Sequence, residues 1–131
     1  MKISASKLSG PALDWAVATC DGYTCYCPET EKILPPRKGY GWVALCDLNY
    51  QSDWAQGGPI IEREGIDIQQ VFGGYEGSFA APVGWKAMRH VAGGAINPKL
   101  FIAATPLIAA MRCFVASKLG DEVDVPDELM Q

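Results

Sequence analysis

The stretch TPLIAAMRCFVASKLG, residues 105–120, decides how this chain folds. Thr105 is a residue type that caps helix N-termini, and Pro106 suits a first helical position, where no backbone N–H is needed. Gly120 favours the left-handed conformation that ends many helices. The apolar side chains between them recur at helical spacing: Leu107, Ile108, Met111, Phe114, Val115 and Leu119. The pattern predicts a helix over residues 106–119 with this stripe in the core.

A second helix is predicted over about residues 10–20. Pro11 falls in its first turn, where Asp14 also suits the helix dipole, and Asp21-Gly22 offers a left-handed stop. Apolar positions recur there at i, i+4 and i+7: Leu13, Val17 and Cys20. This helix and the one over residues 106–119 supply the two long apolar faces of the chain.

The remaining apolar segments predict strands: residues 2–4, 23–27, 40–48, 66–71 and 85–91. Residues 40–48 are apolar on both faces, which is typical of an interior strand. The glycine-rich residues 72–81 are expected to form a loop. The fold class is therefore α+β, with a small, mainly antiparallel sheet packed against the two helices.

Length and charge limit the class of protein. The chain has 131 residues, which favours one domain, and a net charge of −4. Five of its fifteen acids lie in the last eleven residues, so residues 121–131 are expected to form an acidic, solvated tail. The basic residues form no cluster, which argues against a nucleic-acid partner. The longest apolar run, residues 100–111, is interrupted and too short for a membrane span, so a cytoplasmic protein is expected.

The five cysteines predict reduced thiols. An odd number leaves one thiol outside any complete disulfide framework. Cys25 and Cys27 are separated by a single residue, whereas zinc ligands usually have two to four between them. We therefore expect no metal site and no cofactor.

Residues 53–66 are the candidate ligand-binding loop, because recognition-type side chains are densest there. Trp54 could stack on a planar ligand, Gln56 could read a base edge, and Arg63 could pair with phosphate. A Gly-Gly-Pro turn is expected to open a one-turn helix over residues 59–64, ended by Gly65. Free backbone amides at this turn, together with the helix dipole, would suit an anion. The candidate ligand-binding residues are Asp53, Trp54, Gln56, Gly57, Gly58, Arg63 and Trp85. The alternative is that this stretch is only a well-packed turn.

An enzymatic site has weaker support, and no catalytic residue is assigned. His90 is the only histidine, and a nucleophilic pair with Cys113 or Cys46 would have to be made in space. Asp53, Glu62 and Glu64 could act as paired carboxylates, although such acids are common. The residues leave the enzymatic question open and favour binding without catalysis.

Three blocks of the sequence resemble the NinX-like family of small proteins from tailed phages and prophages. They are TPLIAAMRCFVASKLGDEV (residues 105–123), SDWAQGGPIIERE (residues 52–64) and ALDWAVA (residues 12–18), about a third of the chain. The resemblance implies a phage origin and expression in the cytoplasm of a host bacterium. It supplies no catalytic residues.

Three functions fit these observations. The first is an accessory protein that binds a small anionic or nucleotide-derived ligand, such as a host anti-phage defence signal, without altering it. The second is a protein-interaction module that inhibits a host protein. The third is a small nucleotide hydrolase. A homo-oligomer would suit the first two, because small binders often form their pockets between subunits.

Overall fold

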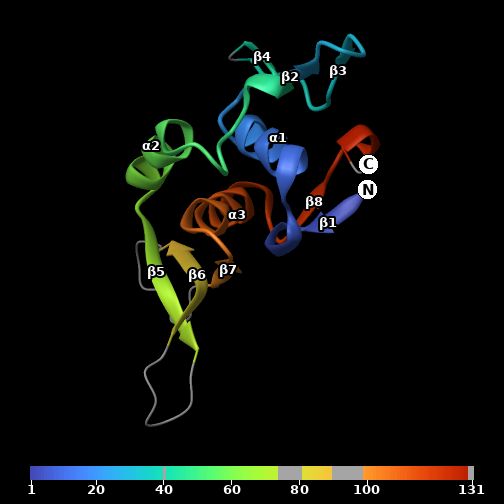
Figure 1. Ribbon diagram of the computed structural model, residues 1–131. Helices are drawn as coiled ribbons and strands as arrows, with labels where there is room; N and C mark the ends of the chain where they lie inside the picture. Colours follow the sequence, from blue (N-terminus) through green and yellow to red (C-terminus); the bar gives the residue numbers. More distant parts are fainter. Residues whose placement is uncertain (40, 74–80, 90–98, 130–131) are drawn as a thin grey trace.

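The computed structural model describes residues 1–39, 41–73, 81–89 and 99–129. These residues contain three α-helices: α1 (Gly10–Cys20), α2 (Trp54–Glu64) and α3 (Pro106–Leu119). Figure 1 shows α1 and α3 side by side, with α2 beside them. In the described residues, no helix is long and apolar enough to cross a bilayer.

The strands form three small sheets rather than one. The largest is antiparallel, in the order β5 (Ile66–Gly73), β6 (Ala81–Arg89), β7 (Phe101–Ala103). A second sheet pairs β1 (Lys2–Ser4) with β8 (Glu122–Asp124), also antiparallel. The third has the order β3 (Lys32–Ile33), β2 (Thr24–Cys27), β4 (Trp42–Ala44), and β2 and β4 are parallel. The mostly antiparallel sheets and the helices confirm the predicted α+β class.

Helix α3 is the centre of the core, as its apolar stripe predicted, except that Leu119 at its C-terminal end is 37% exposed. Met111, Phe114 and Val115 have no exposed surface, and the helix contacts α1, α2, β8 and all three strands of the β5–β6–β7 sheet. Thr105 caps it by accepting a hydrogen bond from the Ile108 amide at 3.2 Å. Gly120 ends it with a φ of 90°. Both predicted helix boundaries, 10–20 and 106–119, are confirmed.

Two predicted elements are wrong. Residues 40–48 do not form a long interior strand. Of the described residues 41–48, only Trp42–Ala44 is a strand, and Leu45–Asp47 forms a 3₁₀ helix. The Gly-Gly-Pro sequence is not a turn, because α2 runs without interruption from Trp54 through Pro59 to Glu64. The predicted stop at Gly65 is correct, with a left-handed φ of 64°.

Three strands had no clear signal in the sequence, and two predictions extend beyond the described residues. β3, β7 and β8 have only two or three residues each, too few to show a period. In the acidic C-terminal segment the side chains of Asp121 and Asp124 are exposed, yet Val123 and Val125 are buried. The predicted loop over residues 72–81 falls largely outside the described residues, as does the end of the strand predicted over 85–91.

Candidate functional site

Two adjoining cavities lie where the 49–51 segment meets α1 and the start of α3. They have volumes of about 420 Å³ and 500 Å³ and share three lining residues, Asp14, Asn49 and Gln51. We call the pair the Gln51 groove. The first cavity is also lined by Gly10, Pro11, Cys27, Pro28, Glu29, Leu45, Cys46 and Leu48. The second is also lined by Ser52, Trp54, Thr105, Pro106, Leu107 and Ile108.

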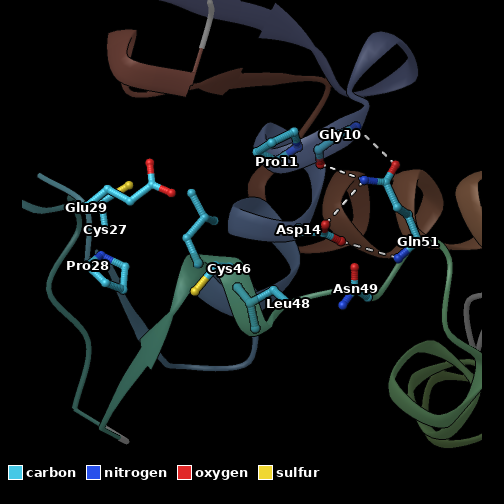
Figure 2. A pocket seen from close by; sticks show the side chains of 11 residues that line it. Gly10, Pro11, Asp14, Cys27, Pro28, Glu29, Cys46, Leu48, Asn49 and Gln51 are labelled. Atoms are coloured by element: carbon cyan, nitrogen blue, oxygen red, sulfur yellow. Dashed lines mark hydrogen bonds between the residues drawn. The ribbon is translucent and has the colours of Figure 1, made fainter.

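Gln51 fixes the segment that carries the groove to the first turn of α1. Its side-chain Nε2 donates to the Gly10 carbonyl at 2.7 Å, and its Oε1 accepts from the Gly10 amide at 3.0 Å. The same Nε2 and the backbone amide of Gln51 each donate to one oxygen of Asp14, at 3.3 Å. Figure 2 shows this clamp, with the Gln51 carboxamide facing Gly10 and Asp14. The carboxamide is fully occupied and therefore positions the groove rather than binding a ligand.

Asp14 is a buried carboxylate whose hydrogen-bond donors come from Tyr50 and Gln51 of the 49–51 segment. It lies beyond the first turn of α1, and only 6% of it is exposed. Burial raises the pKa of Asp14 above its ordinary value of 3.8, and the hydrogen bonds from Gln51 oppose part of that rise. Asp14 was expected to interact with the dipole of α1, and it instead accepts tertiary hydrogen bonds from the 49–51 segment.

Trp54 is the residue of the candidate loop that the groove presents to solvent. Its side chain is 54% exposed and lines the second cavity. Asp53 holds it in place, because Asp53 is the N-cap of α2 and its carboxylate accepts from the Ala55 amide at 2.9 Å. The geometry leaves the indole of Trp54 free to stack on a planar group.

The other predicted residues of α2 are used within the protein. Gln56 accepts from the Asn49 amide at 2.7 Å and donates to the Asp47 carbonyl at 3.1 Å. Gly57 is buried, and a Cβ there would meet the Tyr50 carbonyl oxygen and lie 2.7 Å from the Leu107 side chain. Gln56 and Gly57 therefore join α2 to its neighbours, and neither lines the groove.

Gly58 has room for a side chain. A Cβ there would lie no closer than 3.8 Å to its nearest neighbour, an atom of the Trp54 ring. Neither Gly57 nor Gly58 sits in the expected anion-binding turn, because both lie inside α2. Neither glycine therefore contributes to an anion-binding turn.

Arg63 belongs to a charge cluster at the far end of α2. Its guanidinium lies 2.6 Å from Asp21 and 3.2 Å from Glu64, and 5.6 Å from the centre of the Phe114 ring. Arg89 and Lys118 approach the same Glu64 carboxylate, at 3.6 Å and 3.3 Å. Burial acts to raise the pKa of Glu64, but the hydrogen bond from Arg63 and the surrounding positive charges lower it overall. Arg63 is thus engaged within the protein and does not line the groove.

Trp85 lies on β6, away from the groove. It pairs in register with Gln70 and Ala103, and it packs against the hydrophobic core. The structure does not bring Trp85 and Trp54 together around either cavity of the Gln51 groove.

All five cysteines are free thiols. Burial raises the pKa of Cys25 and of Cys113 to about 11, and that of Cys20 to about 12. These three thiols are therefore protonated near neutral pH and poor nucleophiles. Cys27 and Cys46 line the first cavity. His90, proposed as a partner for a catalytic thiol, lies outside the described residues.

Three groove residues were missed from the sequence: Asp14, Asn49 and Gln51. Asp14 lies within α1, where the other residues from Ala12 to Ala18 are apolar. A carboxylate inside such an apolar run is a signal of a buried polar contact. Asn49 and Gln51 gave no comparable signal. Their positions depend on how the 49–51 segment meets α1.

These features define a small α+β protein built around one buried helix, with a polar groove where all three helices begin. The family model described as Bacteriophage P22, NinX matches residues 4–118, and the chain belongs to this family of phage proteins. The resemblance seen in the three sequence blocks is thereby confirmed. No curated protein matches the chain significantly.

Proposed function

We propose that this phage accessory protein binds a small nucleotide-derived ligand in the Gln51 groove without altering it. The observation that carries the proposal is Trp54, a 54% exposed indole at a cavity of about 500 Å³. Cavities of about 300–1,000 Å³ are typical of small-molecule sites. Stacking on an aromatic side chain contributes about 1–3 kcal/mol per base.

Asn49 supplies the polar contact that Gln56 was expected to make. Its side chain is exposed and lines both cavities. Only its backbone amide is engaged by Gln56. A carboxamide can donate to and accept from a base edge at the same time, which suits recognition of a purine. Trp54 and Asn49 are therefore the proposed contacts to the base.

The charges of the groove favour a ligand with little negative charge. Of the described residues that line it, none is Lys or Arg, and Asp14 and Glu29 are carboxylates. The N-terminal turns of α1 and α3 line the groove, and the start of α2 adjoins it at Trp54. Helix N-termini favour one anionic group through their dipoles and free amides. The expected anionic ligand is thus narrowed to a nucleoside monophosphate or a cyclic nucleotide rather than a polyphosphate.

Removal of a host anti-phage defence signal is the biological role that we propose. Sequestration in the host cytoplasm needs tight binding and no chemistry, and it suits a small phage protein. The hydrolase alternative is less favoured because the three carboxylates considered for catalysis, Asp53, Glu62 and Glu64, do not line the groove. Inhibition of a host protein is the other alternative.

Isothermal titration calorimetry tests the proposal with a panel of nucleoside monophosphates and cyclic nucleotides. ADP-ribose derivatives, which carry a diphosphate, are expected to bind more weakly. Trp54→Ala is expected to weaken binding by about tenfold or more, which corresponds to about 1.4 kcal/mol. Trp42→Ala is the matched control, because Trp42 is 57% exposed and does not line the groove. Ligand recovered after heat denaturation should be unaltered.

Three outcomes would contradict the proposal. If no compound of the panel binds, a nucleotide-derived ligand is ruled out. Equal binding by the Trp54→Ala and wild-type proteins would place the site elsewhere. A chemically altered ligand in the recovered fraction would favour the hydrolase.

A further inference from the structure

The backbone of β8 has an edge that no other described strand pairs with. Met1 and Val125 exchange two backbone hydrogen bonds at 2.8 Å, and the Ala5 amide donates to the Asp121 carbonyl at 2.8 Å. Hydrogen-bonded and non-bonded pairs alternate along an antiparallel ladder, so Val123 also faces β1. The amides and carbonyls of Glu122 and Asp124 therefore point to the opposite edge. In the described residues the sheet has two strands, β1 and β8.

This open edge is bordered by cavities rather than covered. A cavity of about 460 Å³ separates β8 from residues 35–38, and one of about 290 Å³ continues along Val125 and Pro126. The two share Pro35 and Asp124 in their linings. We call them the edge cavities. Figure 1 shows β1 and β8 side by side, next to the two chain ends.

The wall opposite β8 is held in place before any partner binds. The Trp15 indole N–H donates to the Pro35 carbonyl at 3.0 Å. The Thr24 hydroxyl donates to the Lys38 carbonyl at 3.0 Å. A wall fixed at both ends leaves less conformational entropy to be lost when the space is filled.

A buried hydroxyl in the larger edge cavity is also without a partner. Thr19 lines this cavity and is 3% exposed, and its Oγ1 makes no hydrogen bond to any described residue. Buried hydroxyls are normally hydrogen-bonded, so one without a partner needs an explanation. A polar group entering the cavity would supply the missing partner.

The charges around the edge cavities select the kind of segment that fits. Four carboxylates line them, Glu122, Asp124, Asp127 and Glu128, against one lysine, Lys38, and the Met1 amine. A second copy of this chain pairing edge to edge would place β8 carboxylates against β8 carboxylates, which is unfavourable. A segment with basic side chains meets the opposite charge.

We propose that the open edge of β8 binds an extended, basic peptide segment of a partner protein as an added strand. The amides and carbonyls of Glu122 and Asp124 form the ladder, and alternate side chains of the peptide enter the edge cavities. Strand addition of this kind takes its affinity from main-chain hydrogen bonds and its specificity from the pockets beside them. The surface is separate from the Gln51 groove, and the proposal is independent of ligand binding there.

The test uses a soluble peptide of alternating lysine and threonine, titrated into the whole protein labelled with ¹⁵N. The amide resonances of Glu122 and Asp124 are expected to shift, and their hydrogen exchange is expected to slow by about tenfold or more. Val123 already bonds to β1, so its exchange should change less. The same peptide with N-methylated amides on one edge is expected to bind at least about tenfold more weakly.

Glu122→Pro removes the amide on the open edge without removing a bond to β1, and it is expected to abolish binding. Ser4→Pro is the matched control, because Ser4 lies opposite Glu122 and its φ of −60° suits proline. A peptide of alternating glutamate and threonine is expected to bind about tenfold more weakly than the basic one.

Several results would overturn the proposal: no shift at residues 122 and 124, undiminished binding of the N-methylated peptide, or equal binding of the acidic peptide. A concentration-dependent dimer in sedimentation that protects the same two amides would assign the edge to a second copy. The N-methylated peptide keeps the test decisive if the Glu122→Pro protein does not fold.

Discussion

Segments 53–64 and 10–14 contrast in sequence and in structure. The first is crowded with side chains that could recognise a ligand, yet Gln56, Gly57 and Arg63 all make contacts within the protein. The second reads as the plain start of a helix, yet Gly10 and Asp14 line the groove. The difference teaches that a polar residue type indicates a ligand site only when the protein leaves that side chain free.

The largest loss of stability is expected for Gly57→Val. A side chain there would clash with the Tyr50 backbone and with Leu107, so the loss of stability should reach about 3 kcal/mol. Urea unfolding measures it. Gly58→Ala is the matched variant, and it should stabilise the protein by about 0.5–1 kcal/mol because alanine is the better helix former and the space is open. Equal effects at the two positions would contradict the close packing of Gly57 against Tyr50 and Leu107.

The same pair of glycines shows why α2 was not predicted in full. Intrinsic propensity disfavours a helix through Gly57, Gly58 and Pro59, and only tertiary contact with Tyr50 and Leu107 requires the first glycine. Helix α3 was predicted correctly because its cap, its apolar stripe and its glycine stop all agree locally. The Gln51 groove depends on contacts 37 to 41 residues apart in the chain, which no local pattern contains.

Asp14→Asn tests the buried carboxylate of segment 10–14. The new amide places a donor against the donors of Gln51, so a loss of about 2 kcal/mol is expected at acidic pH. The folded-state pKa of Asp14 is raised by burial, so the native protein retains this proton at a higher pH than the unfolded chain does. The stabilising contribution of Asp14 is therefore complete below its ordinary value of 3.8 and declines as pH rises through the raised value.

The measurement is the free energy of unfolding of both proteins from neutral pH down to about pH 4. The difference between wild type and Asp14→Asn should widen as pH falls. Asp53→Asn is the control, because asparagine caps a helix about as well as aspartate and Asp53 is exposed. A gap that narrows towards low pH would contradict the raised pKa.

Gln56→Ala distinguishes a structural residue from a ligand-reading one. It removes the bonds to the Asn49 amide and the Asp47 carbonyl, both exposed, and should cost about 1 kcal/mol. Hydrogen exchange at the Asn49 amide should accelerate. Gln69→Ala on β5 serves as the control, because Gln69 is exposed and its side chain makes no hydrogen bond to a described residue. Lost ligand affinity with unchanged stability would restore the direct role first predicted for Gln56.

Arg63→Ala should have the smallest effect on stability. It also separates most clearly a structural role of α2 from a ligand-binding one. Its guanidinium is about half exposed, so loss of the contacts to Asp21 and Glu64 should cost about 0.5–1 kcal/mol after solvent screening. That cost should shrink in high salt, because screening weakens exposed ion pairs. Arg37→Ala is the matched control, because Arg37 is exposed and no ion pair to a described residue involves it. Nucleotide affinity should be unchanged in both variants, since the guanidinium of Arg63 lies outside the Gln51 groove. A tenfold loss of affinity confined to Arg63→Ala would return the phosphate contact to Arg63 and move the binding site towards the C-terminal end of α2.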